Sequence, residues 1–116
     1  MAQIRYSTTA ESSDNGRSFP LRSGDNIIGR KPLGGPPKAD IAIATQDMGF
    51  SRSHLCIRQE GSKYSVFLTE SKNYTFVNGL PLVQGDVKPL KNGDRIETST
   101  SVLEFSCPDD NSTIIK

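Results

Sequence analysis

The chain has 116 residues, of which 34% are hydrophobic and 23% are charged, and it contains ten Gly, seven Pro and no Trp. This length suits one compact domain and leaves no room for a two-domain enzyme. Fourteen Lys and Arg against thirteen Asp and Glu give a formal net charge of +1, which is too balanced to drive binding to nucleic acid or to a membrane.

Short segments that alternate apolar and polar residues recur along the chain, whereas Gly, Pro or Asn interrupts every helical spacing of apolar residues. The sequence therefore predicts an all-β domain. Strands are expected at Ile4–Ser7, Ser18–Leu21, Asn26–Gly29, Asp40–Ala44, His54–Gln59, Tyr64–Thr69, Thr75–Val77, Arg95–Thr98 and Val102–Cys107. We expect two antiparallel sheets packed as a sandwich, with function on the loops at one end.

Turn-forming residues separate these segments. Asn78-Gly79 predicts a tight hairpin turn, and Gly93-Asp94 predicts a turn before the strand at Arg95. The longest irregular stretch, Lys31–Lys38, combines Pro and Gly residues that block both helix and ladder formation. It is expected to be a surface loop, which either merely connects two strands or flanks a function of Arg30.

The cysteines and the chain ends bear on location and domain limits. Cys56 and Cys107 lie in predicted strands without metal-ligand or redox spacing, so buried reduced thiols are favoured over a disulfide. With no apolar run of about 18 residues and no signal-peptide core, we expect a cytoplasmic protein, or a nuclear one in a eukaryote. Residues 1–107 are expected to form one domain and Pro108–Lys116 a polar tail or the start of a linker.

Four short motifs together carry the functional information. They are Ile28-Gly29-Arg30, Ser51-Arg52-Ser53-His54, Asn73-Tyr74-Thr75-Phe76-Val77-Asn78-Gly79 and Asn92-Gly93-Asp94-Arg95-Ile96. In this order and spacing they resemble the forkhead-associated (FHA) domain, a phosphopeptide-binding β-sandwich. The resemblance covers about Phe19–Phe105 and implies a two-sheet antiparallel sandwich of about eleven short strands, without a cofactor or a metal.

What the resemblance implies is a non-catalytic module that docks a phosphothreonine-containing segment of a partner protein, produced by a Ser/Thr kinase. It assigns phosphate binding to Arg30, Ser51 and Arg52. Lys72 is a further candidate for the phosphate, and Asn73 is the candidate for the peptide backbone. A phosphothreonine carries about −1.5 to −2 charges and three acceptor oxygens, so guanidinium forks and a hydroxyl donor suit it.

Four further residues are expected to support this site. Gly29 allows close backbone approach beside Arg30, and Asn78-Gly79 closes a hairpin. His54, the only histidine, resembles the family's structural His, which ties the binding loop to neighbouring backbone. A hydrolase built on Ser51 and His54 is the catalytic alternative. We expect no enzyme, because no orienting carboxylate and no Gly-x-Ser-x-Gly elbow accompany the pair.

One position departs from the family pattern. Tyr74 follows Asn73 where many members of the family have Gly, and a positive φ there would strain a Tyr, so we expect a differently shaped loop. Tyr74 would then line the peptide groove. This departure leaves a second hypothesis, a phosphate-independent protein-interaction scaffold of the same fold. With no long apolar edge or heptad pattern, we expect a monomer.

Overall fold

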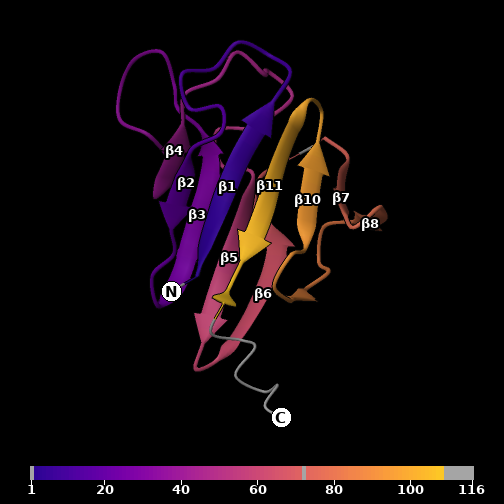
Figure 1. The fold of residues 1–116 in the computed structure, drawn as a ribbon. Helices are drawn as coiled ribbons and strands as arrows, with labels where there is room; N and C mark the ends of the chain where they lie inside the picture. Colours follow the sequence, from indigo (N-terminus) through magenta and orange to yellow (C-terminus); the bar gives the residue numbers. More distant parts are fainter. Residues whose placement is uncertain (1, 72, 109–116) are drawn as a thin grey trace.

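The computed structural model describes residues 2–71 and 73–108, and within them it forms eleven short strands in two sheets that face each other (Figure 1). The strands are β1 (Gln3–Thr8), β2 (Ser18–Pro20), β3 (Gly24–Arg30), β4 (Ile41–Ile43), β5 (Leu55–Glu60), β6 (Lys63–Leu68), β7 (Thr75–Val77), β8 (Leu80–Leu82), β9 (Lys88–Leu90), β10 (Arg95–Thr98) and β11 (Ser101–Ser106). One sheet has the order β2-β1-β11-β10-β7-β8, and the other has the order β4-β3-β5-β6-β9.

The predicted all-β sandwich is confirmed, and each strand expected from the sequence overlaps an observed one. Sequence reasoning missed two strands, β8 and β9. Each has three residues with a proline at its centre, Pro81 in β8 and Pro89 in β9. A proline has no backbone N–H to donate, which argues against a central strand. Both strands instead lie at sheet edges, where the missing donor breaks no ladder on the outer side.

One strand pair departs from the antiparallel expectation. β3 and β4 run parallel, with Ile28 opposite Ile41 and Arg30 opposite Ile43. The Pro- and Gly-rich segment 31–40 makes the crossover that a parallel pair requires. Since parallel strands end at the same edge, Arg30 and the chain after Ile43 leave the sheet side by side.

The core lies between the sheets and is built from alternate residues of the long strands. Its buried side chains are Ile4, Tyr6, Ile28, Ile43, Phe50, Leu55, Ile57, Val66, Leu68, Val77, Leu82, Leu90, Ile96, Leu103 and Phe105, with smaller neighbours around them. β6 shows this alternation, because Val66 and Leu68 are buried while Phe67 packs under the Arg58 guanidinium. Both cysteines, Cys56 and Cys107, are buried free thiols.

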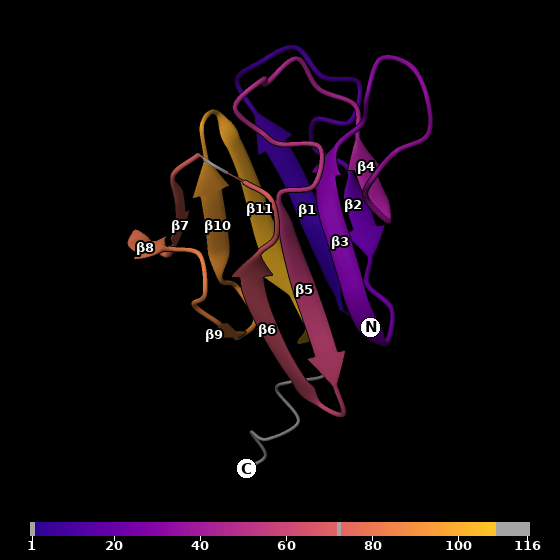
Figure 2. The same ribbon diagram turned by 180° about the vertical axis from the view of Figure 1, so that it is seen from behind.

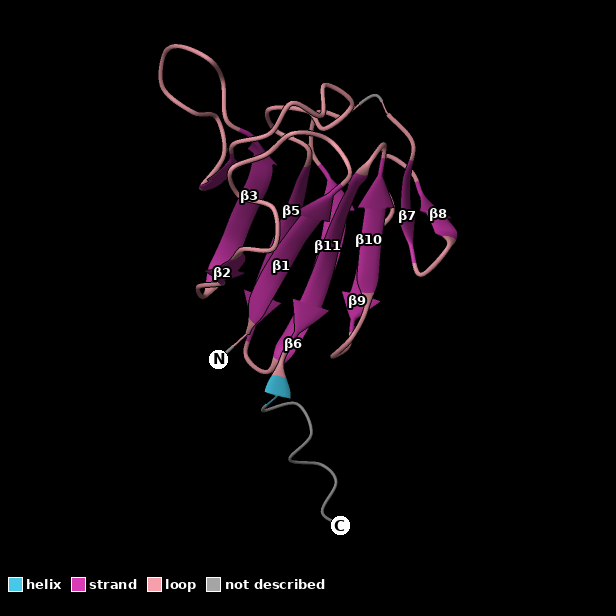
Figure 3. Ribbon diagram, turned by 45° about the horizontal axis from the view of Figure 1, so that its top comes forward, coloured by secondary structure: helices cyan, strands magenta, loops and turns pink. Residues whose placement is uncertain are grey.

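The loops that follow β1, β3, β4, β6 and β10 gather at one end of the sandwich, as Figures 1 and 2 show from opposite sides. Figure 3, tilted toward this end, shows the β3–β4 loop projecting furthest. Pro108 is the last described residue, so the predicted tail beyond it lies outside the described residues. No helix in residues 2–71 and 73–108 is long and apolar enough to cross a membrane.

Candidate functional site

Arg30, the last residue of β3, is held in place by the loop that precedes β5. Its backbone N–H donates to the Ser51 carbonyl at 2.9 Å, and its Nε donates to the Phe50 carbonyl at 3.0 Å. The two terminal guanidinium nitrogens have no hydrogen bond or ion pair within the described residues. The side chain is therefore oriented by one nitrogen and presents the other two for an external ligand.

The close approach between β3 and this loop depends on Gly29. A Cβ added at Gly29 would lie 2.2 Å from the Arg52 carbonyl oxygen and 2.7 Å from the Ser51 carbonyl oxygen. Both contacts are shorter than van der Waals separation, and both are with backbone, which cannot swing aside. Only glycine fits, and its absent side chain lets Ser51 and Arg52 lie beside Arg30.

His54 links the loop that carries Ser51 to the start of β7. Its Nδ1 accepts the backbone N–H of Ser51 at 2.9 Å, and its Nε2 lies 2.9 Å from the Thr75 hydroxyl. The ring is fully buried and stacks on Phe50 with 5.2 Å between ring centroids. Burial lowers the pKa of His54 to about 4, against a smaller opposing effect of the Asp47 charge.

The arrangement of His54 also bears on the catalytic alternative. Neither ring nitrogen bonds the Ser51 hydroxyl, because one holds the Ser51 backbone and the other faces Thr75. The nucleophile and base pair that a hydrolase requires is not formed. Among residues 2–71 and 73–108, no group of three His, Cys, Asp or Glu side chains is positioned to hold a metal ion.

Asp47 anchors the other side of the same loop. Its buried carboxylate accepts hydrogen bonds from the hydroxyls of Ser99 at 2.7 Å and Ser101 at 2.6 Å, and from the backbone N–H groups of Gly49 at 3.0 Å and Thr100 at 3.2 Å. Burial alone would raise the pKa of Asp47, but these donors favour the charged form and hold it below its usual range. The β4–β5 loop is thus fixed to the β10–β11 turn.

Asn73 approaches this loop from the β6–β7 side. Its amide nitrogen donates to the Gly49 carbonyl at 2.8 Å, while its backbone N–H donates to the Ser71 hydroxyl at 3.1 Å. The side-chain oxygen has no partner within the described part of the chain. The amide therefore bridges two loops and keeps an acceptor, and one further N–H, for a ligand.

The backbone at Tyr74 avoids the positive φ that would strain a tyrosine. Within the described residues, a positive φ at a non-glycine residue occurs only at Asn78 and Ser99. Tyr74 therefore does not adopt the positive φ that a glycine would tolerate at this position, in keeping with a loop shaped to avoid that strain. Its side chain is 86% exposed. The predicted hairpin is confirmed, because Asn78 at φ 51° and Gly79 at φ 83° join β7 to β8 as a primed turn requires.

The predicted residues meet in one pocket of about 310 Å³. Its lining comprises Arg30, Lys38, Met48, Ser51, Arg52, Ser53, Glu70 and Asn73. Lys72 lies outside the described residues. Sequence reasoning missed Lys38, Met48, Ser53 and Glu70 as lining residues. Ser53 lies in a singled-out motif and Lys38 ends the loop that flanks Arg30, whereas nothing in the sequence marks Met48 or Glu70.

Positive charge predominates in this pocket. Arg30, Lys38 and Arg52 contribute three cations, against one carboxylate from Glu70. The Arg52 guanidinium and the Ser51 hydroxyl have no partner in the described ranges. Lys38 and Glu70 form a loose ion pair at 3.9 Å, with both side chains more than half exposed. The pocket can therefore bind an anion through the terminal nitrogens of Arg30 at the end of β3 and through Ser51 and Arg52 in the β4–β5 loop, whose side-chain donors have no partner within the described residues.

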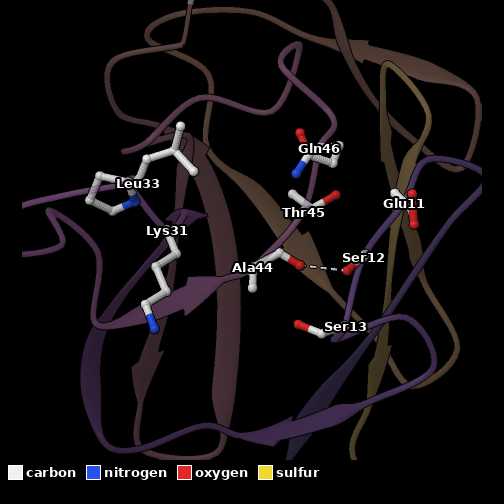
Figure 4. Close-up of a pocket in the computed structure, with 9 residues that line it drawn as sticks. Glu11, Ser12, Ser13, Lys31, Leu33, Ala44, Thr45 and Gln46 are labelled. Atoms are coloured by element: carbon white, nitrogen blue, oxygen red, sulfur yellow. Dashed lines mark hydrogen bonds between the residues drawn. The ribbon is translucent and has the colours of Figure 1, made fainter.

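A larger pocket, of about 660 Å³, opens between the β1–β2 and β3–β4 loops (Figure 4). Its polar lining includes Lys31, Glu11 and Gln46, and none of the predicted site residues. Two of its lining residues are joined by a hydrogen bond, in which the Ser12 hydroxyl donates to the Ala44 carbonyl (Figure 4). One cation and one carboxylate leave no charge excess for an anion, so this pocket is the weaker candidate for a phosphate.

The sequence profile of the FHA domain matches residues 26–98, more than half of the chain. Two curated relatives show local similarity. Protein FraH of Nostoc is 38% identical over 61 residues, which are 53% of this chain and 21% of the relative. FHA domain-containing protein FhaA of Mycobacterium tuberculosis is 37% identical over 87 residues, which are 71% of this chain and 15% of the relative. The chain thus spans only a small part of either relative.

Two solved structures resemble the fold more completely. The FHA domain of FhaA, complexed with the intracellular domain of Rv3910, has a TM-score of 0.69 and 31% identity, with 90% of this chain and 99% of that chain covered. A structure from a study of phosphothreonine-dependent FHA domain interactions has a TM-score of 0.68 and 31% identity, with 90% of this chain and 96% of that chain covered.

Proposed function

Since the chain belongs to the FHA domain family, whose members are interaction modules, we propose that it docks a phosphothreonine-containing segment of a partner protein. The single observation that carries this proposal is the pocket at the loop end of the sandwich. There the terminal nitrogens of Arg30, the Ser51 hydroxyl and the Arg52 guanidinium converge, and none of them has a partner among residues 2–71 and 73–108.

The chemistry of the pocket suits a phosphate better than a carboxylate. A phosphate monoester carries about −1.5 to −2 charges and three acceptor oxygens, so it can engage a guanidinium fork, a hydroxyl and a second cation together. Arg30 is already oriented by its bond to Phe50, so little side-chain entropy is lost when it binds. Lys72 remains a further candidate for the phosphate.

Asn73 is proposed to hold the backbone of the bound segment. Its side-chain oxygen, which has no partner within the described residues, accepts a peptide N–H while its amide nitrogen stays on the Gly49 carbonyl. This bond would fix the position of the bound segment along the site, next to its phosphorylated residue. The partner is proposed to be a kinase substrate that meets this domain in the cytoplasm, with the domain as a monomer.

Related solved structures support a peptide or protein partner. In one, an FHA domain is bound to the intracellular domain of another protein, and a second comes from work on phosphothreonine-dependent FHA domain interactions. These interactions belong to those proteins. They make a phosphorylated protein segment the ligand to test first on this chain.

The test is binding to one degenerate peptide library in three forms, with phosphothreonine, phosphoserine or unmodified threonine at the fixed position. We expect binding to the phosphothreonine form alone, and a loss of at least about tenfold in Arg30→Ala and Ser51→Ala, since each removes a charge-assisted bond. Lys31→Ala is the matched control, because it removes the neighbouring cation that lines the other pocket. Urea unfolding of each variant checks that the fold is retained.

Two outcomes would overturn the proposal. Equal binding of the three forms would favour the phosphate-independent scaffold. A loss of binding in Lys31→Ala as large as that in Arg30→Ala would mean that general positive charge, and not the pocket, attracts the peptide. Binding that persists at high salt would also favour the phosphate-independent scaffold, because salt screens phosphate contacts at a half-exposed site.

A further inference from the structure

A groove of about 540 Å³ adjoins the phosphate pocket along the β6–β7 loop and β8. It is lined by Leu68, Glu70, Ser71, Asn73, Tyr74, Leu82, Val83 and Gln84. Glu70 and Asn73 line both cavities, so the groove and the pocket lie next to each other. An extended segment whose phosphothreonine lies in the pocket therefore has room to place a neighbouring side chain in the groove.

The walls of the groove combine exposed apolar surface with a single carboxylate. Tyr74 is 86% exposed and Val83 is 55% exposed, which is unusual for residues of their size. The Glu70 side chain is 67% exposed and is the only charged side chain that lines the groove among the described residues. No cation lines it within that part of the chain.

This combination matches a lysine or arginine side chain. The methylene groups of such a residue pack on apolar surface while the cation reaches a carboxylate, and an exposed tyrosine ring adds a cation–π contact. An acidic side chain in the groove would face Glu70 and be repelled. A plain aliphatic side chain would cover the walls but leave the carboxylate unpaired.

Glu70 becomes available when phosphate binds. Within residues 2–71 and 73–108, the Glu70 carboxylate pairs only with Lys38, at 3.9 Å, in an exposed and therefore weak ion pair. Lys38 also lines the phosphate pocket. A bound phosphate, with nearly twice the charge of a carboxylate, attracts Lys38 away from Glu70. The released carboxylate then faces the groove without a cation from the described part of the chain.

We propose that Glu70, with Tyr74 and Val83, makes this domain select phosphothreonine segments that carry a lysine or arginine beside the phosphorylated residue. This inference rests on the proposed phosphothreonine binding, because it places the basic residue in the same bound segment. It assigns Glu70 a part in partner selection, although its charge opposes the phosphate.

The experiment measures the affinity of single phosphothreonine peptides in which each flanking position carries Lys, Ala or Glu in turn. We expect one position at which Lys binds about threefold to tenfold more tightly than Ala, as an ion pair partly shielded from water permits. Glu70→Gln abolishes that preference, and Glu70→Lys shifts it to Glu. Glu60→Gln is the matched control, because it removes the same charge at the β5–β6 turn, at the opposite end of the sandwich.

The outcomes separate this inference from the proposed function. A wild-type domain that requires phosphothreonine but binds Lys, Ala and Glu peptides equally at every position would overturn the inference and leave the function standing. No dependence on phosphothreonine would overturn both. If Glu70→Gln still prefers a lysine in the peptide, Glu70 does not cause that preference, because the peptide's lysine must then pair with another group.

Discussion

His54 accepts, through Nδ1, a hydrogen bond of 2.9 Å from the backbone N–H of Ser51. A backbone N–H can only donate, so Nδ1 is unprotonated and the neutral ring carries its proton on Nε2. That proton faces the Thr75 hydroxyl, which in turn donates to the Asn73 carbonyl at 3.3 Å. One buried neutral imidazole thus connects the two loops that supply the pocket.

The connection predicts that stability depends on pH through His54. Its pKa is lowered from 6.5 to about 4 in the folded protein, so the unfolded chain binds a proton first as pH falls. The neutral His54 ring contributes its full share of the free energy of unfolding above pH 6.5. That share is lost as the pH falls from 6.5 toward 4, at up to about 1.4 kcal/mol per pH unit and on the order of 3 kcal/mol in all. Urea unfolding at a series of pH values measures this slope.

The control for this slope is His54→Gln, which removes the only histidine of the chain. Between pH 5 and 6.5 its free energy of unfolding should change little with pH, whatever its absolute stability. Asp47, whose pKa is lowered, loses its contribution only as pH falls below the usual aspartate range. A flat wild-type profile between pH 5 and 6.5 would contradict the buried neutral state of His54.

Substitution of Gly29 tests the close approach between β3 and the binding loop. In Gly29→Ala the new Cβ would lie 2.2 Å from the Arg52 carbonyl oxygen, so the loop must move. We expect a loss of about 1–3 kcal/mol in the free energy of unfolding and weaker phosphopeptide binding. Gly34→Ala is the control, because its Cβ would meet no atom within 4 Å. Equal stability of the two variants would show that the loop yields without cost.

Asp47 gives a further prediction, about the base of the loop. Asp47→Asn removes a negative charge that accepts four hydrogen bonds. It also places an amide N–H, itself a donor, opposite some of these donors. We expect a loss of about 2–3 kcal/mol in stability, measured by urea unfolding, because hydrogen bonds to buried charges are strong. Asp86→Asn, at an exposed position with one long bond of 3.4 Å, should change stability little. A similar loss of stability in Asp47→Asn and Asp86→Asn would contradict the prediction that the buried Asp47 carboxylate stabilises the loop.

Much of the fold could be predicted because the longer strands alternate clearly and carry turn residues at their ends. Tyr64, Val66 and Leu68 in β6 show the alternation well. Asn78-Gly79 marks the turn between β7 and β8. β8 and β9 escaped prediction because three residues are too few to show alternation and each contains a proline. The parallel pairing of β3 with β4 depends on how segment 31–40 crosses over, which no local pattern encodes.

The candidate site was predictable to the extent that short motifs carry it. Arg30, Ser51, Arg52 and Asn73 lie in motifs of fixed spacing, and they line one pocket. Glu70 and Met48 reach the same pocket from loops whose paths depend on distant anchors such as the bonds to Asp47. Tyr74 departs from the family pattern, and its backbone has no positive φ, as expected of a loop that must accommodate a side chain where glycine is common.

The two arginines of the pocket should respond differently to replacement by lysine. Arg30 uses Nε to hold the Phe50 carbonyl and presents two further nitrogens, whereas Arg52 is exposed and has no bond within the described residues. Lysine keeps the charge but loses the planar fork, so Arg30→Lys should weaken phosphothreonine peptide binding about tenfold and Arg52→Lys only about twofold. Peptide titration of both variants at one ionic strength measures the ratio. Equal losses would mean that both residues act as simple positive charges, and a greater loss in Arg52→Lys would transfer the bidentate role from Arg30 to Arg52.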